Sequence, residues 1–234
     1  MNTTQIHQFL RDIAAHNSRE WFQDHRAEYQ AARQSFEHDV QQAIAAIAAF
    51  DPTVAHITLR DATYRFNRDT RFSPDKSPYK RHFGAYIAAH GKKALHGGYY
   101  LHLEPGHCLL ACGGYYLPTN ILTSCRNEIM ANIRQWRDVV EAPQFLQLFG
   151  KPGSGVFEQS SNGFGLQHLK TCPSGFPRDY EHLHYLRMKD YCCWHAVADD
   201  FFDDPQTWIP EMQRIFQVAK PMMDFINNVI DDYE

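Results

Sequence analysis

Apolar positions at helical spacing mark both ends of the chain. Over Thr3–His16 they fall three or four residues apart, which predicts a short amphipathic helix. A second, longer helix is expected to begin at Asn17, which would act as its N-cap with Glu20 three residues later, and to end near Phe50. Asp204, which is followed by a proline, predicts the start of a helix that continues to the end of the chain.

The pattern between these helices is mixed. Apolar and polar residues alternate in several short segments bounded by turn residues, which is typical of strands. The predicted strands are Thr63–Phe66, Gly84–Ala88, Tyr99–Glu104, Cys108–Tyr116, Gly165–Lys170 and Tyr191–Val197. Helical spacing returns over residues 119–140 and 179–188. This order predicts an α+β fold, with a mainly antiparallel sheet packed with long N-terminal and C-terminal helices, formed as a single domain over residues 1–234.

Composition narrows the class of protein. Hydrophobic residues make up 44% of the chain and charged residues 21%, which excludes a disordered or fibrous chain. The longest apolar run, Ala43–Phe50, is far shorter than the ~20 residues that a membrane span needs, and the first residues do not resemble a secretory signal. We therefore expect a cytoplasmic protein that does not engage a membrane, with its six cysteines reduced.

Charge is distributed unevenly along the chain. Residues 60–93 hold nine Lys and Arg but three Asp, although the whole chain has a formal net charge of −4. A basic segment inside an acidic chain is a candidate binding site for an anion. This segment is therefore expected to form the most positive surface of the molecule.

The densest part of this segment lies between two predicted strands. Guanidinium groups bind carboxylate or phosphate in a two-point fashion, and ammonium groups add positive charge. Asp69 could orient an arginine or act as a base. In the alternative interpretation, Arg68, Asp69, Arg71 and Asp75 pair with one another and brace a long loop. The candidate anion-binding residues are Arg65, Arg68, Arg71, Lys76, Lys80 and Arg81.

The predicted strand Tyr99–Glu104 adds a second set of polar groups. Alternation places Tyr100, His102 and Glu104 on one face of the strand. A histidine and a glutamate two residues apart on one face can transfer protons, so Asp69, His102 and Glu104 are the candidate catalytic residues. A solvated sheet face is the alternative. The loop cations and this face are expected to converge on one cleft.

No metal site is expected from the sequence. His102, His107, Cys108 and Cys112 lie close together, but no pair of cysteines repeats at zinc-site spacing. The acidic run of residues 199–204 could hold Mg²⁺, yet acidic residues also gather at helix N-termini without a metal. The second explanation is preferred.

Three motifs occur in order along the chain: "NSREWFQDHRAEY", "RDTRFSPDKSPYK" and "GGYYLHLEPG". With these motifs the chain resembles the bacterial conserved-hypothetical family called domain of unknown function 2461, from Asn17 to about Tyr191. The resemblance implies a single conserved domain in the cytoplasm. It supplies no reaction, because the family has no established activity.

These observations leave two functional hypotheses. The first is a protein that binds an anionic small molecule, through phosphate or carboxylate, in the Arg68–Arg81 loop; whether it is also an enzyme stays open. The second is a non-catalytic interaction module that docks an acidic partner or a nucleic-acid backbone, with nucleic acid the less favoured partner. A purely structural role for the loop stays open as well. The sequence identifies no cofactor, reaction or oligomeric state.

Overall fold

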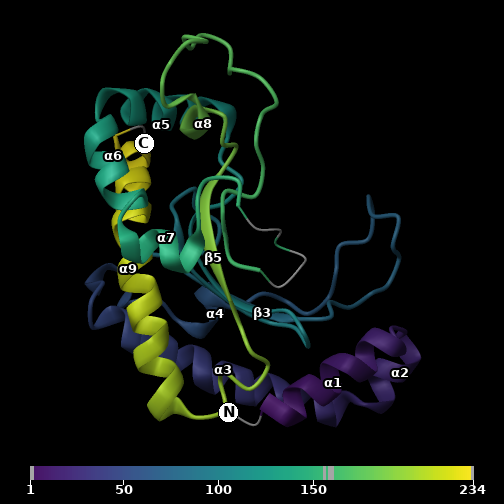
Figure 1. Cartoon of the computed structure of the whole chain (residues 1–234). Coiled ribbons are helices and arrows are strands. Elements are labelled where there is room, and N and C mark those ends of the chain that lie inside the picture. Colours follow the sequence, from purple (N-terminus) through teal and green to yellow (C-terminus); the bar gives the residue numbers. More distant parts are fainter. Residues whose placement is uncertain (1–2, 155–156, 158–160, 233–234) are drawn as a thin grey trace. The chain divides into compact units, whose positions relative to one another are not determined.

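A computed structural model describes residues 3–154, 157 and 161–232. Helices cover the two ends of the chain and a long stretch after its first three strands (Figure 1). The described helices are α1 (Thr3–Ala15), α2 (Arg19–Asp24), α3 (Arg26–Ala48), the 3-10 helix η1 (Pro52–Val54), α4 (Leu59–Ala62), α5 (Thr119–Ala131), α6 (Ile133–Val140), α7 (Pro143–Phe149), α8 (Leu183–Leu186) and α9 (Pro205–Asp231).

The described strands form one five-stranded antiparallel sheet, in the order β1-β2-β3-β5-β4. This arrangement confirms the α+β prediction, and it places β1 next to β2. The strands are β1 (Phe83–Ile87), β2 (Gly98–Leu103), β3 (Cys108–Gly114), β4 (Gly163–Phe164) and β5 (Tyr191–Val197).

The chain divides into two compact units. The first comprises residues 1–92, 100–109 and 197–213, and the second comprises residues 93–99, 110–196 and 214–234. Each unit is assembled from three separate parts of the chain, and β2, β3, β5 and α9 each contribute residues to both. Single-domain organisation stays a prediction.

An aromatic cluster fills the core of the first unit, where α1 packs on α3. The apolar stripe of α1 is buried, and its Phe9 lies 5.8 Å from both Tyr29 and Phe66 between ring centroids. Phe66 also lies 5.3 Å from Phe83, the first residue of β1. Each large ring removes much apolar surface from water, so this cluster joins the helices to the segment that precedes β1.

A second aromatic cluster fills the core of the other unit. Trp136 on α6 is fully buried, and three rings meet it edge-on at centroid distances of 5.1–6.0 Å. These rings belong to Tyr185 of α8, Tyr191 of β5 and Phe225 of α9. The edge-on geometry places the positive ring edges against the negative ring faces, which is a favourable arrangement.

The predicted long N-terminal helix is wrong at its start and in its continuity. Ser18, not Asn17, is the N-cap of α2, because its side chain accepts a hydrogen bond from the Trp21 N–H at 3.1 Å. The helix is also interrupted at His25, which lies between α2 and α3 and whose Nδ1 contacts the Trp21 carbonyl oxygen at 2.8 Å. The Asn17 side chain instead forms hydrogen bonds with the backbone of Tyr79, in the same unit.

Three other predicted elements differ from the structure. Residues 63–66 form no strand: Thr63 makes only an isolated bridge to Ala85. The helix predicted over residues 119–140 is divided into α5 and α6 at Asn132, whose backbone leaves the helical region with ψ at 39°. The strand predicted at residues 165–170 is reduced to a single bridge at His168, while the true strand β4 comes just before it.

No described helix combines the length and the apolar character that crossing a membrane requires. All six cysteines are free thiols.

Asp39, a buried acid on α3, generates a prediction about stability. It is 1% exposed, and neither of its carboxylate oxygens has a hydrogen-bond partner among the described residues. Burial raises the pKa of Asp39 from 3.8 to about 6, so the folded state favours the neutral form. The native chain should therefore lose stability as the pH rises from about 4 to about 6.

Asp39→Asn, which mimics the neutral form, should raise the free energy of unfolding at pH 7.5 by on the order of 2 kcal/mol. The gain should disappear by pH 4. Urea unfolding at both pH values checks this, with the exposed Asp24→Asn on α2 as the control. An equal effect of Asp39→Asn at both pH values would contradict this account of Asp39.

Candidate functional site

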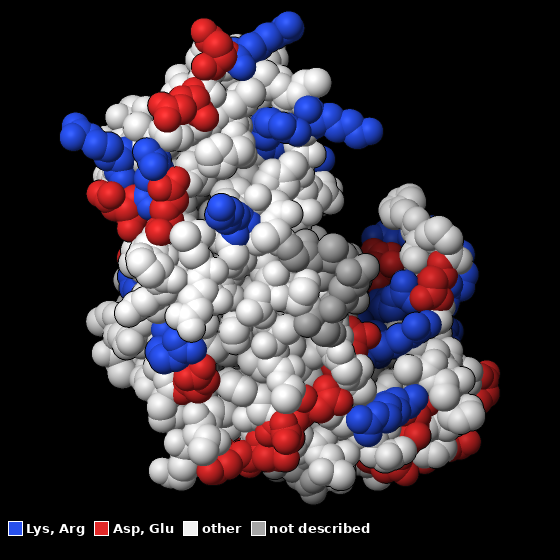
Figure 2. All heavy atoms as spheres, in the orientation of Figure 1, with Lys and Arg blue, Asp and Glu red and all other residues white. Residues whose placement is uncertain are grey.

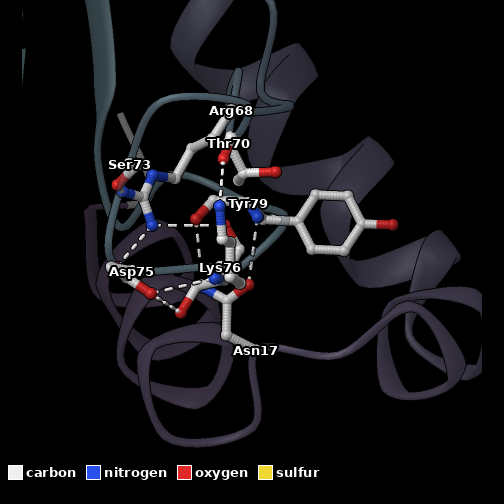
Figure 3. A network of polar contacts seen from close by, with 8 residues as sticks. Asn17, Arg68, Thr70, Ser73, Asp75, Lys76 and Tyr79 are labelled. Carbon is white, nitrogen blue, oxygen red and sulfur yellow. Dashed lines mark hydrogen bonds and ion pairs between the residues drawn. The ribbon is translucent and has the colours of Figure 1, made fainter.

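The basic loop is braced by its own acids (Figure 3). Arg68 forms an ion pair with Asp75 and donates further hydrogen bonds to the Ser77 carbonyl oxygen at 3.2 Å and to the Ser73 hydroxyl at 3.3 Å. Asp75 also accepts from the Ser77 hydroxyl at 2.6 Å and the Ser77 N–H at 2.9 Å. Hydrogen bonds from Ser77 and then from Arg68 hold the pKa of Asp75 well below its usual value.

The tip of the loop is paired in the same way. Arg71 donates to both carboxylate oxygens of Asp69, at 3.0 and 2.7 Å, and these hydrogen bonds lower the pKa of Asp69 to about 2. Lys76 donates to the Thr70 carbonyl oxygen at 3.0 Å. At the right of Figure 2, where Figure 1 shows this loop, Lys and Arg side chains lie beside Asp and Glu. That the segment is the most positive surface stays a prediction.

Asn17 fixes the end of the loop. Its side-chain amide donates to the Tyr79 carbonyl oxygen and accepts from the Tyr79 N–H, both at 3.0 Å (Figure 3). The Tyr79 ring is buried and stacks on Phe22 at a centroid distance of 4.1 Å. The next N–H, that of Lys80, donates to the Phe66 carbonyl oxygen at 3.0 Å. The backbone that carries Lys80 is therefore held on both sides.

Lys80 differs from the other loop cations. It is partly buried, and its Nζ lies 5.0 Å from the centroid of the Tyr64 ring. In the described part of the chain, no carboxylate lies within 4.0 Å of this ammonium group. Burial, followed by the positive charges of Arg65 and Arg33, lowers the pKa of Lys80. The charged groups that act on Lys80 are therefore the cations Arg65 and Arg33.

Side chains of β2 and the following turn form a connected polar cluster. The Tyr100 hydroxyl lies 2.9 Å from His102 Nδ1, and His102 Nε2 lies 3.1 Å from Glu104 Oε2. His107 Nδ1 lies 3.5 Å from the same glutamate oxygen. A Cβ on Gly84 of β1 would lie 2.5 Å from the Tyr100 hydroxyl, so glycine leaves the room that this contact needs. His102 is 4% exposed, unlike a residue on a solvated sheet face.

His82, which immediately precedes β1, joins this cluster. Its ring centroid lies 4.4 Å from that of His102, and burial lowers the pKa of His82 to about 3. One potential ligand atom from each of His82, His102 and Glu104 lies within 4.8 Å of the other two. The sequence analysis missed His82, although its position just before a predicted strand could have drawn attention to it.

A second cluster in the same unit contains a thiol. Cys108 Sγ lies 3.6 Å from His7 Nε2, while His7 Nδ1 lies 3.6 Å from Asp199 Oδ2. The order of atoms resembles a nucleophile, a base and an orienting acid. However, burial raises the pKa of Cys108 to about 12, and a reactive cysteine needs its thiolate form. We therefore treat this cluster as structural.

The expected candidates are thus distributed between two groups. One group, which we call the brace, consists of loop residues that contact one another or the loop backbone: Arg68, Asp69, Arg71 and Lys76. Lys80 is the loop residue whose charge acts on His82 and His102. Burial and then the positive charge of Arg65 lower the pKa of Lys80. The Arg81 side chain is exposed. Convergence of all these cations with His102 or Glu104 on one cleft stays a prediction.

A hollow of about 350 Å³ lies elsewhere, on α6 in the second unit. It is lined by Arg134, Arg137, Asp138, Glu141 and Ala142. Arg137 pairs with Glu141 at 2.9 Å, and the Tyr185 hydroxyl donates to the same carboxylate at 2.8 Å. Two of the four charged groups that line this hollow therefore pair with each other.

Comparison with protein families gives one finding. The family described as "Conserved hypothetical protein (DUF2461)" matches residues 5–225, which is most of the chain. No curated protein and no solved structure matches the chain.

The brace predicts different results for two neighbouring arginines. Arg68→Ala should lower the free energy of unfolding by roughly 1–2 kcal/mol, because it removes the ion pair with Asp75 Oδ2 and the hydrogen bond to the Ser77 carbonyl oxygen. Arg71→Ala should change the melting temperature little, since the Arg71 side chain is 77% exposed. Thermal melts of both variants check this, and a larger loss in Arg71→Ala would contradict the brace.

Proposed function

Because the chain belongs to the conserved hypothetical family DUF2461, whose description states no activity, we propose its function from its own geometry: it binds a small anion, a phosphate or a carboxylate, through Lys80 and Arg65. The binding site would lie in the first unit, beside the polar cluster that contains His102 and Glu104. We also propose a cytoplasmic location, with which the six free thiols are consistent.

The observation that carries this proposal is the environment of Lys80. A partly buried ammonium group is normally paired, because its loss of hydration must be offset. Lys80 instead has the Tyr64 ring on one side and the charges of Arg65 and Arg33 nearby. An aromatic face attracts a cation by only about 0.5–2 kcal/mol. A bound anion would supply the missing negative charge.

The loop cations and Asp69 enter this proposal unequally. Arg68, Arg71 and Lys76 already have partners, and both oxygens of Asp69 are taken by Arg71, so we assign these four to the brace. Arg65 is exposed and close enough to Lys80 for their charges to interact. Arg81 stays a candidate on charge alone.

We extend the proposal from binding to enzymatic activity. The charge of Lys80 acts on His102, so an anion on Lys80 would lie near the His102–Glu104 pair. A hydrogen-bonded histidine and glutamate can relay a proton to or from such a ligand. We propose His102 and Glu104 as the reactive groups.

One observation favours the docking function as a second candidate. Phe72, at the loop tip, is 94% exposed, and Arg71 lies over its ring at 5.8 Å from the centroid. An exposed aromatic ring beside a cation is suited to stacking on an unpaired base. In this case the loop tip, rather than Lys80, would make the contact.

Lys80→Met tests the anion site. Isothermal titration with inorganic phosphate should show binding to the native chain and binding weakened at least tenfold in Lys80→Met. Without phosphate, Lys80→Met should melt at the same temperature as the native chain or slightly higher, because repulsion from Arg65 is removed. Lys76→Met is the matched control, since it removes an exposed lysine of the same loop.

Acetate and single-stranded DNA complete the experiment as probes. Acetate should compete with phosphate if one site takes both kinds of anion. DNA binding that is lost in Phe72→Ala but unchanged in Lys80→Met would favour docking instead. Equal phosphate binding by the native chain and Lys80→Met would rule out the site proposed here.

A further inference from the structure

We propose that His82, His102 and Glu104 bind one divalent transition-metal ion of the Zn²⁺ or Co²⁺ type. Imidazole nitrogens and a carboxylate oxygen are ligands that such ions prefer. The inference goes beyond anion binding and does not depend on it. With the ion bound, His102 Nε2 and Glu104 would hold the metal instead of exchanging a proton with each other. It also departs from the sequence-based expectation of no metal site, which did not consider His82.

The spacing of the ligand atoms supports a shared ion. Zinc lies about 2.0–2.2 Å from nitrogen and oxygen ligands, so tetrahedral ligands lie roughly 3.2–3.6 Å from one another. Glu104 Oε2 lies 3.1 Å from His102 Nε2, close to this range. His82 also contributes an atom within 4.8 Å of those of His102 and Glu104. On binding an ion, side-chain rotation would have to bring the His82 atom from at most 4.8 Å to this spacing.

The surroundings of His102 orient the ring for this role. Metal-bound histidines usually hydrogen-bond through their second nitrogen to an outer partner that fixes the ring. The Tyr100 hydroxyl occupies that place at Nδ1, which directs Nε2 toward Glu104. When a metal binds Nε2, the ring proton would reside on Nδ1 and be donated to the Tyr100 oxygen. Because Gly84 has no side chain, Tyr100 has the room to make this contact.

These residues lie on or beside two neighbouring strands. His102 is on β2, and His82 directly precedes the neighbouring strand β1. Glu104 and His107 are joined by a turn in which the His107 N–H donates to the Glu104 carbonyl oxygen at 2.8 Å. A ligand set built on two adjacent strands and a tight turn is preorganised, which lowers the entropy cost of binding an ion.

Access to the cluster is partial. The Glu104 side chain is 31% exposed and that of His107 is 15% exposed, while His102 is almost fully buried. The partial exposure of Glu104 makes this ligand accessible to an ion from solvent. A catalytic metal site keeps one position for water or substrate, and the exposed side of Glu104 suits that position.

One other cluster of potential ligands, His7, Cys108 and Asp199, provides an internal control. Its potential ligand atoms also lie within 4.8 Å of one another, but one of them is sulfur. A thiolate ligand gives Co²⁺ an intense charge-transfer absorption band in the near ultraviolet, whereas nitrogen and oxygen ligands give only weaker visible bands. The two clusters can therefore be distinguished by spectrum as well as by mutation.

The experiment uses the full chain, treated with a chelator and then titrated with Co²⁺ alone. We expect one equivalent to bind with visible bands and no sulfur band, and Zn²⁺ to displace it. His82→Ala and the conservative Glu104→Gln should each weaken Co²⁺ binding at least tenfold. Cys108→Ser and His56→Ala, which removes an exposed histidine of the same unit, should bind as the native chain does.

Circular dichroism and thermal melts establish that each variant is folded, and Glu104→Gln covers the case in which His82→Ala is not. The proposal is overturned if the folded native chain binds no Co²⁺. It is also overturned if the sulfur band appears and is lost in Cys108→Ser, or if folded His82→Ala and Glu104→Gln bind Co²⁺ like the native chain. Because no phosphate is present, none of these results depends on the anion site.

Discussion

The two hydrogen bonds between the Asn17 amide and the Tyr79 backbone are the contacts on which the candidate site depends. They satisfy both backbone groups of Tyr79, whose ring is anchored on Phe22 in the aromatic core. Three residues, Lys80, Arg81 and His82, link Tyr79 to the start of β1. A part-buried amide that bonds to both a donor and an acceptor cannot be replaced by an apolar residue without leaving polar groups unpaired. Asn17, which lies between α1 and α2, thus positions residues about 60 positions farther along the chain.

The paired arginines of the loop and Lys80 have opposite electrostatic surroundings, although they lie in one short segment. Asp69 and Asp75 neutralise Arg71 and Arg68, so two of the five positive charges between Arg68 and Arg81 are compensated within the loop. Lys80 comes after these pairs and faces other cations instead. A bound anion would offset that charge. If a metal ion also binds at His82, its charge would add to that of Lys80 and strengthen anion binding, and by linkage the anion would strengthen metal binding.

Local pattern predicted the elements well and long-range pairing poorly. The α+β class, β1, β2, β3, β5 and α9 could be inferred because periodicity and turn residues act over a few positions. Asn17 was misassigned as a cap because its true partner, Tyr79, is distant in sequence. The proximity of Tyr100, His102 and Glu104 follows from strand alternation, whereas His82 joins them only through the pairing of β1 with β2. No spacing rule within one segment encodes that pairing.

The central claim is that the polar cluster at the end of β2, rather than the arginine-rich loop, is the functional centre of this chain. Crystals grown with Zn²⁺ and phosphate test it most directly, through anomalous scattering recorded on both sides of the zinc absorption edge. The account predicts one strong anomalous peak bonded to His82, His102 and Glu104, with phosphate density at Lys80. Phosphate among Arg68, Arg71 and Lys76, with no zinc peak at His102, would contradict it.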